Sequence, residues 1–135
     1  MTHDYSRTIR LVDTDAAGVV YFAHVLSMCH EAYEAALEAT GINLREFFRD
    51  AAAAIPIVRG EVDFFRPLFC GDEILIRLSP QQLSENEFEI AYQILSATDL
   101  NQCLASAKTR HVCINPATRR RISLPESMLQ WLSEN

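Results

Sequence analysis

The chain has 135 residues and a mass of 15.3 kDa, a size that predicts a single domain over residues 1–135 with one hydrophobic core. Hydrophobic residues make up 49% of the sequence and charged residues 22%, which excludes a disordered or low-complexity chain. The net charge of −6 excludes nucleic acid or an anionic membrane as the main partner, because both require a positive field.

The first third of the chain predicts one strand followed by one long helix. Side chains alternate over residues 5–13, as in a strand, up to a turn-like stretch from Asp13 to Gly18. Helical spacing follows from about residue 20 to residue 40, and Gly41 supplies the C-terminal stop. The apolar positions cover most of the helix, so we expect other elements to wrap around it: Val25, Met28, Cys29, Ala32, Tyr33, Ala36 and Leu37.

The rest of the chain predicts mainly strands. Asn43 and Glu46 have capping-box spacing and predict a short helix to about Ala53. Strand patterns with links short enough for antiparallel hairpins follow over residues 57–66, 73–83, 87–97 and 103–114. A short helix is expected at the end, through Leu132. This order predicts an α+β fold in which a curved antiparallel sheet of about five strands wraps around one long central helix.

The segment from Asp13 to Phe22, where the first strand meets the long helix, is the strongest candidate for a site. A helix N-terminus offers unpaired N–H groups and a partial positive charge, so the amides of roughly Gly18 to Phe22 could polarise a ligand carbonyl. A nearby carboxylate could attack that carbonyl or deprotonate a water molecule. The alternative is that Asp13 or Asp15 only caps the helix, which is the commoner role of aspartate there.

The pattern Asp13-x-Asp15-x-x-Gly18, followed by Val19-Val20-Tyr21-Phe22, resembles the 4-hydroxybenzoyl-CoA thioesterase family of hotdog-fold enzymes. The order of elements is similar to the hotdog arrangement over nearly the whole chain. Several short blocks resemble the cyanobacterial 1,4-dihydroxy-2-naphthoyl-CoA thioesterase branch: Met28 to Glu34, Asp63-Phe64-Phe65-x-Pro67 and Cys70-Gly71-Asp72. The resemblance implies a hydrolase for an aromatic acyl-CoA in phylloquinone (vitamin K1) biosynthesis or the related menaquinone pathway, with no metal and no cofactor.

The resemblance also implies roles for individual residues. Asp15 matches the catalytic carboxylate, either as a nucleophile or as a base toward water, and the backbone of Gly18 or Phe22 polarises the thioester carbonyl. Some hotdog thioesterases carry their carboxylate on the long helix, so the secondary candidates are Asp13, His24, Glu31 and Glu34. The acyl pocket is expected at the helix start and the following strand: Tyr21, Ile57, Val58, Phe64 and Phe65.

Several other polar residues are candidates for a functional or a structural role. His24 either contacts the acyl group or is a satisfied structural histidine. His30 and Glu34 are expected to form a helix-surface pair, because the second His of a zinc helix is missing. The basic residues are candidates for binding the CoA phosphates, the alternative being a solvated loop: Lys108, Arg110, Arg119, Arg120 and Arg121.

One core on one helix leaves little interior for a naphthoyl group. We therefore expect a homo-oligomer, a dimer or a homotetramer built as a dimer of dimers, with the site at a subunit interface. Three other functions stay open: a general thioesterase for short or branched acyl-CoA or acyl carrier protein, a hotdog dehydratase, and a non-catalytic acyl-binding module. A dehydratase is disfavoured because it needs a catalytic His where Asp15 stands.

The four cysteines are expected to be reduced and to pack as small hydrophobic residues, since none has CxxC spacing: Cys29, Cys70, Cys103 and Cys113. The N-terminus has no basic stretch followed by an apolar run, and no apolar run approaches about 18 residues. We therefore expect a cytoplasmic protein without membrane insertion.

Overall fold

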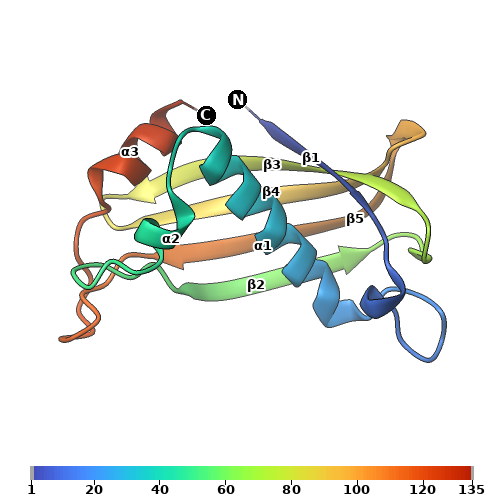
Figure 1. The fold of residues 1–135 in the computed structure, drawn as a ribbon, viewed down its shortest axis with the longest axis horizontal. Coiled ribbons are helices and arrows are strands. Elements are labelled where there is room, and N and C mark those ends of the chain that lie inside the picture. The colour runs from blue at the N-terminus through green and yellow to red at the C-terminus, as the bar shows by residue number, and fades with distance from the viewer. Residues whose placement is uncertain (1, 135) are drawn as a thin grey trace.

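The structure is a computed structural model that describes residues 2–134 of the chain. Its elements are β1 (His3–Thr8), the 3₁₀ turn η1 (Leu11–Asp13), α1 (Phe22–Ala39), α2 (Leu44–Phe47), β2 (Ile57–Phe64), β3 (Glu73–Ser84), β4 (Glu87–Ser96), β5 (Asp99–Val112) and α3 (Glu126–Ser133). The five strands form one antiparallel sheet in the order β1-β3-β4-β5-β2. The sheet curves around α1, and α2 and α3 lie at the C-terminal end of that helix (Figure 1). This arrangement confirms the predicted α+β hotdog fold.

The core lies between α1 and the concave face of the sheet. All seven apolar positions that helical spacing assigned to the interior of α1 are buried. The alternating inner residues of β4 are also buried, as are alternating residues of β5 and the residue that follows it: Phe88, Ile90, Tyr92, Ile94, Ala105, Ala107, Thr109, His111 and Cys113. On β2, a Cβ at Gly60 would lie 3.3 Å from Leu26 Cδ1, so this glycine lets the strand approach α1 closely.

The first strand is shorter than the alternation of side chains predicted. β1 ends at Thr8, and the chain turns into η1, which leaves Leu11 and Val12 each 76% exposed. The strand prediction was wrong from Ile9 to Asp13, where the Asp13 carboxylate accepts a hydrogen bond from the Arg10 N–H at 2.8 Å and turns the backbone.

The short helix after Gly41 is also shorter than predicted. Asn43 caps α2 as expected, since its side chain accepts from the Glu46 N–H at 3.1 Å. The helix nevertheless ends at Phe47, well before Ala53. An Asp50 side chain that accepts from the Ala52 N–H at 2.8 Å holds a turn there instead. Within residues 2–134, no helix is long and apolar enough to cross a membrane.

Candidate active site

The loop from Asp13 to Tyr21 (hereafter the 13–21 loop) joins η1 to α1 and carries Asp15. The Asp15 N–H donates to the Val19 carbonyl at 3.0 Å, and the Gly18 N–H donates back to the Asp15 carbonyl at 3.0 Å. Gly18 has a φ of 82°, a left-handed conformation that glycine adopts without the strain of a side chain. Thr14 and Val20 bridge the base of this turn. The sequence therefore folds locally into a tight turn with Asp15 near its tip.

The Asp15 carboxylate is exposed and does not cap the helix. Its Oδ1 accepts from the Ala17 N–H at 2.8 Å, and its Oδ2 has no hydrogen-bond partner within residues 2–134. Tyr21 is the N-cap of α1, without a side-chain cap bond. The capping alternative is therefore wrong for Asp15, and also for Asp13, whose carboxylate binds Arg7. A carboxylate placed like that of Asp15 can meet a ligand from outside.

The Phe22 N–H is the donor that the start of α1 offers to a ligand. Phe22 is the first residue of the helix, and its amide has no acceptor in the described part of the chain. The Tyr21 amide donates to the Asp13 carbonyl at 2.9 Å, and the Gly18 amide is held inside its own turn. Of the two predicted carbonyl-polarising amides, Phe22 is therefore the one without a local hydrogen bond within residues 2–134, and the helix dipole adds to its effect.

An apolar hollow of about 330 Å³ adjoins the 13–21 loop. Val19 and Val20 form one wall, and the chain from Phe64 to Leu68 forms the other. Two residues predicted for the acyl pocket, Phe64 and Phe65, line this hollow, and both are exposed in the single chain. The remaining three predicted pocket residues do not line it, although all are exposed: Tyr21, Ile57 and Val58.

The secondary carboxylate candidates Asp13, Glu31 and Glu34 each bind a basic side chain. Asp13 is buried, and the Arg7 guanidinium, which donates to it at 2.6 Å, holds the pKa of this carboxyl below its usual value. Glu31 Oε2 accepts from Arg7 Nε at 2.7 Å and from the Tyr5 hydroxyl at 2.8 Å. Glu34 lies 3.0 Å from His30 Nδ1, which confirms the predicted helix-surface pair.

His24 lies in the first turns of α1, with its Nδ1 3.1 Å from the Asp13 carbonyl oxygen. This contact supports the structural reading of His24. Arg7, which forms ion pairs with both Asp13 and Glu31, was not singled out from the sequence. Its signal was present, since Arg7 alternates with Tyr5 and Ile9 on the face of the first strand that turns inward, where a charge needs partners.

Of the predicted CoA-phosphate residues, Arg119, Arg120 and Arg121 lie at the opposite end of the sheet from the 13–21 loop of the same chain, and Lys108 and Arg110 lie on β5 opposite Glu61 and Arg59 of β2. Arg119 to Arg121 end a turn that follows Ile114, beside the Ile57 end of β2, whereas the 13–21 loop adjoins the Phe64 end (Figure 1). Three of the five basic residues pair with Glu87 or Glu89 at 3.3–3.8 Å: Lys108, Arg110 and Arg121. Arg119 and Arg120 are exposed and have no ion pair within residues 2–134.

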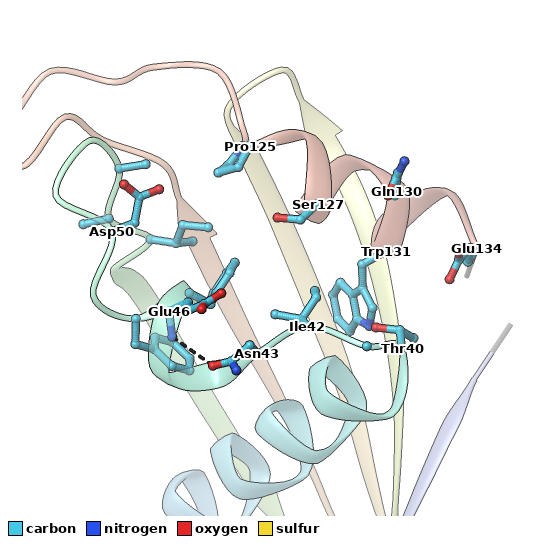
Figure 2. A pocket seen from close by; sticks show the side chains of 16 residues that line it. Thr40, Ile42, Asn43, Glu46, Asp50, Pro125, Ser127, Gln130, Trp131 and Glu134 are labelled. Atoms are coloured by element: carbon cyan, nitrogen blue, oxygen red, sulfur yellow. Dashed lines mark hydrogen bonds between the residues drawn. The ribbon is translucent and has the colours of Figure 1, made fainter.

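A larger hollow of about 750 Å³ lies at the other end of α1, between the segment after that helix and α3 (Figure 2). Its rim carries the carboxylates of Glu46, Asp50 and Glu134, and Ile42 and Trp131 form part of its apolar wall. None of the predicted site residues lines it. Among residues 2–134, no group of three His, Cys, Asp or Glu side chains could hold a metal ion. The 13–21 loop and its smaller hollow therefore form the candidate active site.

Comparison with known proteins identifies the family of the chain. The sequence pattern of the thioesterase-like superfamily matches residues 9–132 of the chain. The 1,4-dihydroxy-2-naphthoyl-CoA hydrolase of Rippkaea orientalis is 62% identical over 130 residues, which cover 96% of this chain and 94% of that protein. The corresponding hydrolase of Gloeothece citriformis is 61% identical over 129 residues, covering 96% and 90%.

A solved structure agrees over the same length. A 1,4-dihydroxy-2-naphthoyl-CoA thioesterase from Synechocystis superimposes with a TM-score of 0.94 at 40% sequence identity, covering 99% of this chain and 97% of that one. The chain belongs to the thioesterase-like superfamily.

Proposed function

We propose that this protein hydrolyses 1,4-dihydroxy-2-naphthoyl-CoA to 1,4-dihydroxy-2-naphthoate and CoA, a step of phylloquinone biosynthesis. The observation that carries the proposal is that the 13–21 loop holds the exposed Asp15 carboxylate, leads directly into the Phe22 N–H and lines an apolar hollow through Val19 and Val20. Relatives of that name, up to 62% identical over almost the full chain, support the choice of substrate. A location in the cytoplasm stays a prediction.

The proposed reaction needs one carboxylate and one N–H donor. The Phe22 N–H donates to the thioester carbonyl oxygen and stabilises the negative charge that develops on it. Asp15 either attacks the carbonyl carbon, which gives an anhydride that water opens, or takes a proton from the attacking water. In both routes the C–S bond breaks, the hydroxyl of water joins the acyl group, and the thiolate of CoA receives the remaining proton.

We further propose that the site is completed by a second copy of the chain across β2. This strand pairs only with β5 among the described elements, so its other edge presents unpaired N–H and C=O groups. Val58 is 52% exposed and Phe64 is 49% exposed, which gives this edge an apolar surface suited to association. The assembly would be a homodimer, alone or paired into a tetramer.

A two-fold axis at this edge would bring distant parts of two copies together. Antiparallel pairing places the Ile57 end of one β2 beside the Phe64 end of the other. Because Arg119 and Arg120 lie near the Ile57 end, they would approach Asp15 of the second copy. This arrangement supports a composite site, in which one copy supplies the carboxylate and the other supplies charge for the CoA phosphates.

A panel of thioesters tests the substrate. The purified protein is assayed for thiol release from 1,4-dihydroxy-2-naphthoyl-CoA, benzoyl-CoA, and short and branched aliphatic acyl-CoA esters. We expect the highest kcat/KM for the naphthoyl ester. Faster turnover of an aliphatic ester or of an acyl carrier protein ester would replace the proposal by a general thioesterase, and no turnover of any ester would support a binding module.

A single substitution tests the site. Asp15→Asn keeps the size and the Oδ1 acceptor of the side chain but cannot act as a nucleophile or base, so kcat should fall by about 10³-fold or more. Asp50→Asn is the matched control, because Asp50 Oδ1 also accepts from the N–H two residues on, at the same 2.8 Å, but lies at the other hollow. Turnover of Asp15→Asn at the wild-type rate would move the catalytic role to Glu31 or Glu34.

A further inference from the structure

Arg7 connects β1 to the 13–21 loop through Asp13 and to α1 through Glu31. Its Nη1 donates to Asp13 Oδ2 at 2.6 Å and its Nη2 to Asp13 Oδ1 at 3.1 Å, while its Nε donates to Glu31 Oε2 at 2.7 Å. The Arg7 side chain is only 16% exposed. A guanidinium is suited to this place because its planar fork can bind two carboxylates at once.

Asp13 carries this anchoring to both ends of the 13–21 loop. Its carboxylate also accepts from the Arg10 N–H at 2.8 Å, which fixes the chain entering the loop. Its carbonyl oxygen accepts from the Tyr21 N–H at 2.9 Å and lies 3.1 Å from His24 Nδ1. Asp13 is two residues before Asp15, and Tyr21 directly precedes the Phe22 donor. One residue therefore holds the carboxylate end and the N–H end of the candidate site together.

The anchoring of the 13–21 loop depends on the charges of Arg7 and Asp13, which form a largely buried ion pair. The hydrogen bond from Arg7 is the main cause that holds the pKa of Asp13 below its ordinary value, and the same bond raises the pKa of Arg7. Both groups therefore stay charged at neutral pH. Removal of Arg7 leaves the Asp13 carboxylate buried without its cation, which costs more than the loss of a surface pair. Removal of the Asp13 charge leaves Arg7 paired with Glu31 alone. The Tyr5 hydroxyl, which donates to Glu31 at 2.8 Å, supports the outer side of the network.

We propose that Arg7 and Asp13 are positioning residues, which set the distance and direction between the Asp15 carboxylate and the Phe22 N–H. The inference rests on the proposed function, because it assigns the pair a task only if Asp15 and Phe22 act on the thioester. Neither Arg7 nor Asp13 needs to touch the substrate. A shift of the loop by about 1 Å is enough to lower a rate by about 100-fold, since both groups must meet one carbonyl.

Substitution of Arg7 tests the proposal. Arg7→Met should lower kcat for 1,4-dihydroxy-2-naphthoyl-CoA by about 10- to 100-fold, with KM changed by less than about 3-fold, because the hollow and the basic residues are unaltered. Arg7→Lys should recover part of the loss, since a lysine can reach one carboxylate but not both. Arg77→Met is the matched control, because Arg77 forms a similar two-bond pair with Asp4, at 2.8 and 3.1 Å, at an exposed position.

Asp13→Asn provides a second variant that keeps the shape of the loop. If Arg7→Met fails to fold, as judged by circular dichroism, Asp13→Asn and Arg7→Lys are compared with the wild type at a temperature well below their unfolding. A fall in kcat with little change in KM supports the positioning role. Folded variants with wild-type kcat, or with a rise in KM alone, would overturn it.

A double-mutant cycle separates positioning from general damage. In an Asp15→Asn background, Arg7→Met should change the residual rate by less than about 2-fold, because the residue that Arg7 positions is already inactive. Losses that multiply would overturn the proposal, since Arg7 would then act independently of Asp15. Wild-type turnover of Asp15→Asn alone contradicts the proposed site itself. An inactive Asp15→Asn with a fully active Arg7→Met overturns only the positioning role.

Discussion

The imidazole of His111 stacks on the ring of Phe88, with centroids 4.5 Å apart and planes inclined by 8°. His111 is 1% exposed, and its Nε2 lies 2.8 Å from Thr109 Oγ1, which in turn is 3.2 Å from the Tyr92 hydroxyl. Burial, with a smaller contribution from His30, lowers the pKa of His111 from 6.5 to about 4. A neutral histidine is therefore part of the core.

The lowered pKa of His111 predicts that the folded protein loses stability in mild acid. Between pH 6.5 and about 4 the unfolded chain binds a proton at His111 and the folded chain does not, so the free energy of unfolding falls as the pH falls. The slope from this one group approaches about 1.4 kcal/mol per pH unit. Urea unfolding at several pH values measures it.

His111→Gln is the comparison for this experiment. The amide can still bond to Thr109 but does not titrate, so the loss of stability between pH 6.5 and 4 should be smaller in the variant. The lowered pKa of Asp13 acts in a lower window, because its contribution is lost only as the pH falls below the ordinary value of 3.8. An equal slope in wild type and His111→Gln would contradict the role assigned to His111.

The second prediction concerns the two glutamates of α1. Glu31 Oε2 already accepts from Arg7 and Tyr5, so it is poorly placed to take a proton from water. Glu31→Gln should lower kcat by about 10-fold or less, through its effect on Arg7, and Glu34→Gln should leave kcat within about 2-fold. Steady-state assays beside Asp15→Asn measure this. A loss of about 10³-fold in Glu31→Gln would make Glu31 the catalytic carboxylate.

The sequence predicted the core well because burial and periodicity are linked. The apolar positions of α1 recur at helical spacing, and the inner residues of β4 recur at a period of two, so each pattern indicates which side chains are buried. The boundaries of β1 and α2 were harder to predict from the sequence. They depend on the hydrogen bonds from Arg10 to Asp13 and from Ala52 to Asp50, in which aspartate side chains compete with regular structure.

The site was predictable only in part, for a similar reason. The Asp15 turn and the first N–H groups of α1 are local, so the spacing of Asp13, Asp15 and Gly18 indicated them. The network of Arg7 joins residues 24 positions apart, and no local pattern specifies such a contact. The separation of Asp15 from Arg119 within one chain also follows from sheet topology and not from sequence spacing.

The third prediction separates the basic residues by their partners. Arg121 pairs with Glu87 at 3.5 Å, whereas Arg119 and Arg120 have no ion pair within residues 2–134. The double substitution Arg119→Ala, Arg120→Ala should raise KM for the CoA ester by about 10-fold and leave the matching pantetheine ester nearly unchanged. Arg121→Ala should have the smaller effect. Equal effects of the double substitution on both esters would exclude a role in phosphate binding.

The fourth prediction tests association through β2. Val58→Lys places a charge on the free edge of this strand, a change that blocks pairing between strands of two chains. We expect a folded monomer with reduced activity. Light scattering after size exclusion measures the mass of the assembly, and thiol release measures the activity. Leu83→Lys is the matched control, since Leu83 is an exposed apolar residue on β3, away from that edge. An unchanged assembly in Val58→Lys would place the interface elsewhere.

Mixing two defective copies tests whether each site is shared between chains. Asp15→Asn is combined in equal amounts with the Arg119→Ala, Arg120→Ala protein, the subunits are exchanged, and the rate is measured below KM. A composite site gives each mixed dimer one intact site, so random pairing should restore about a quarter of the wild-type sites. If carboxylate and arginines act within the same chain, no mixed dimer contains an intact site. The rate of the mixture would then equal the mean of the two parents, which would contradict the shared site.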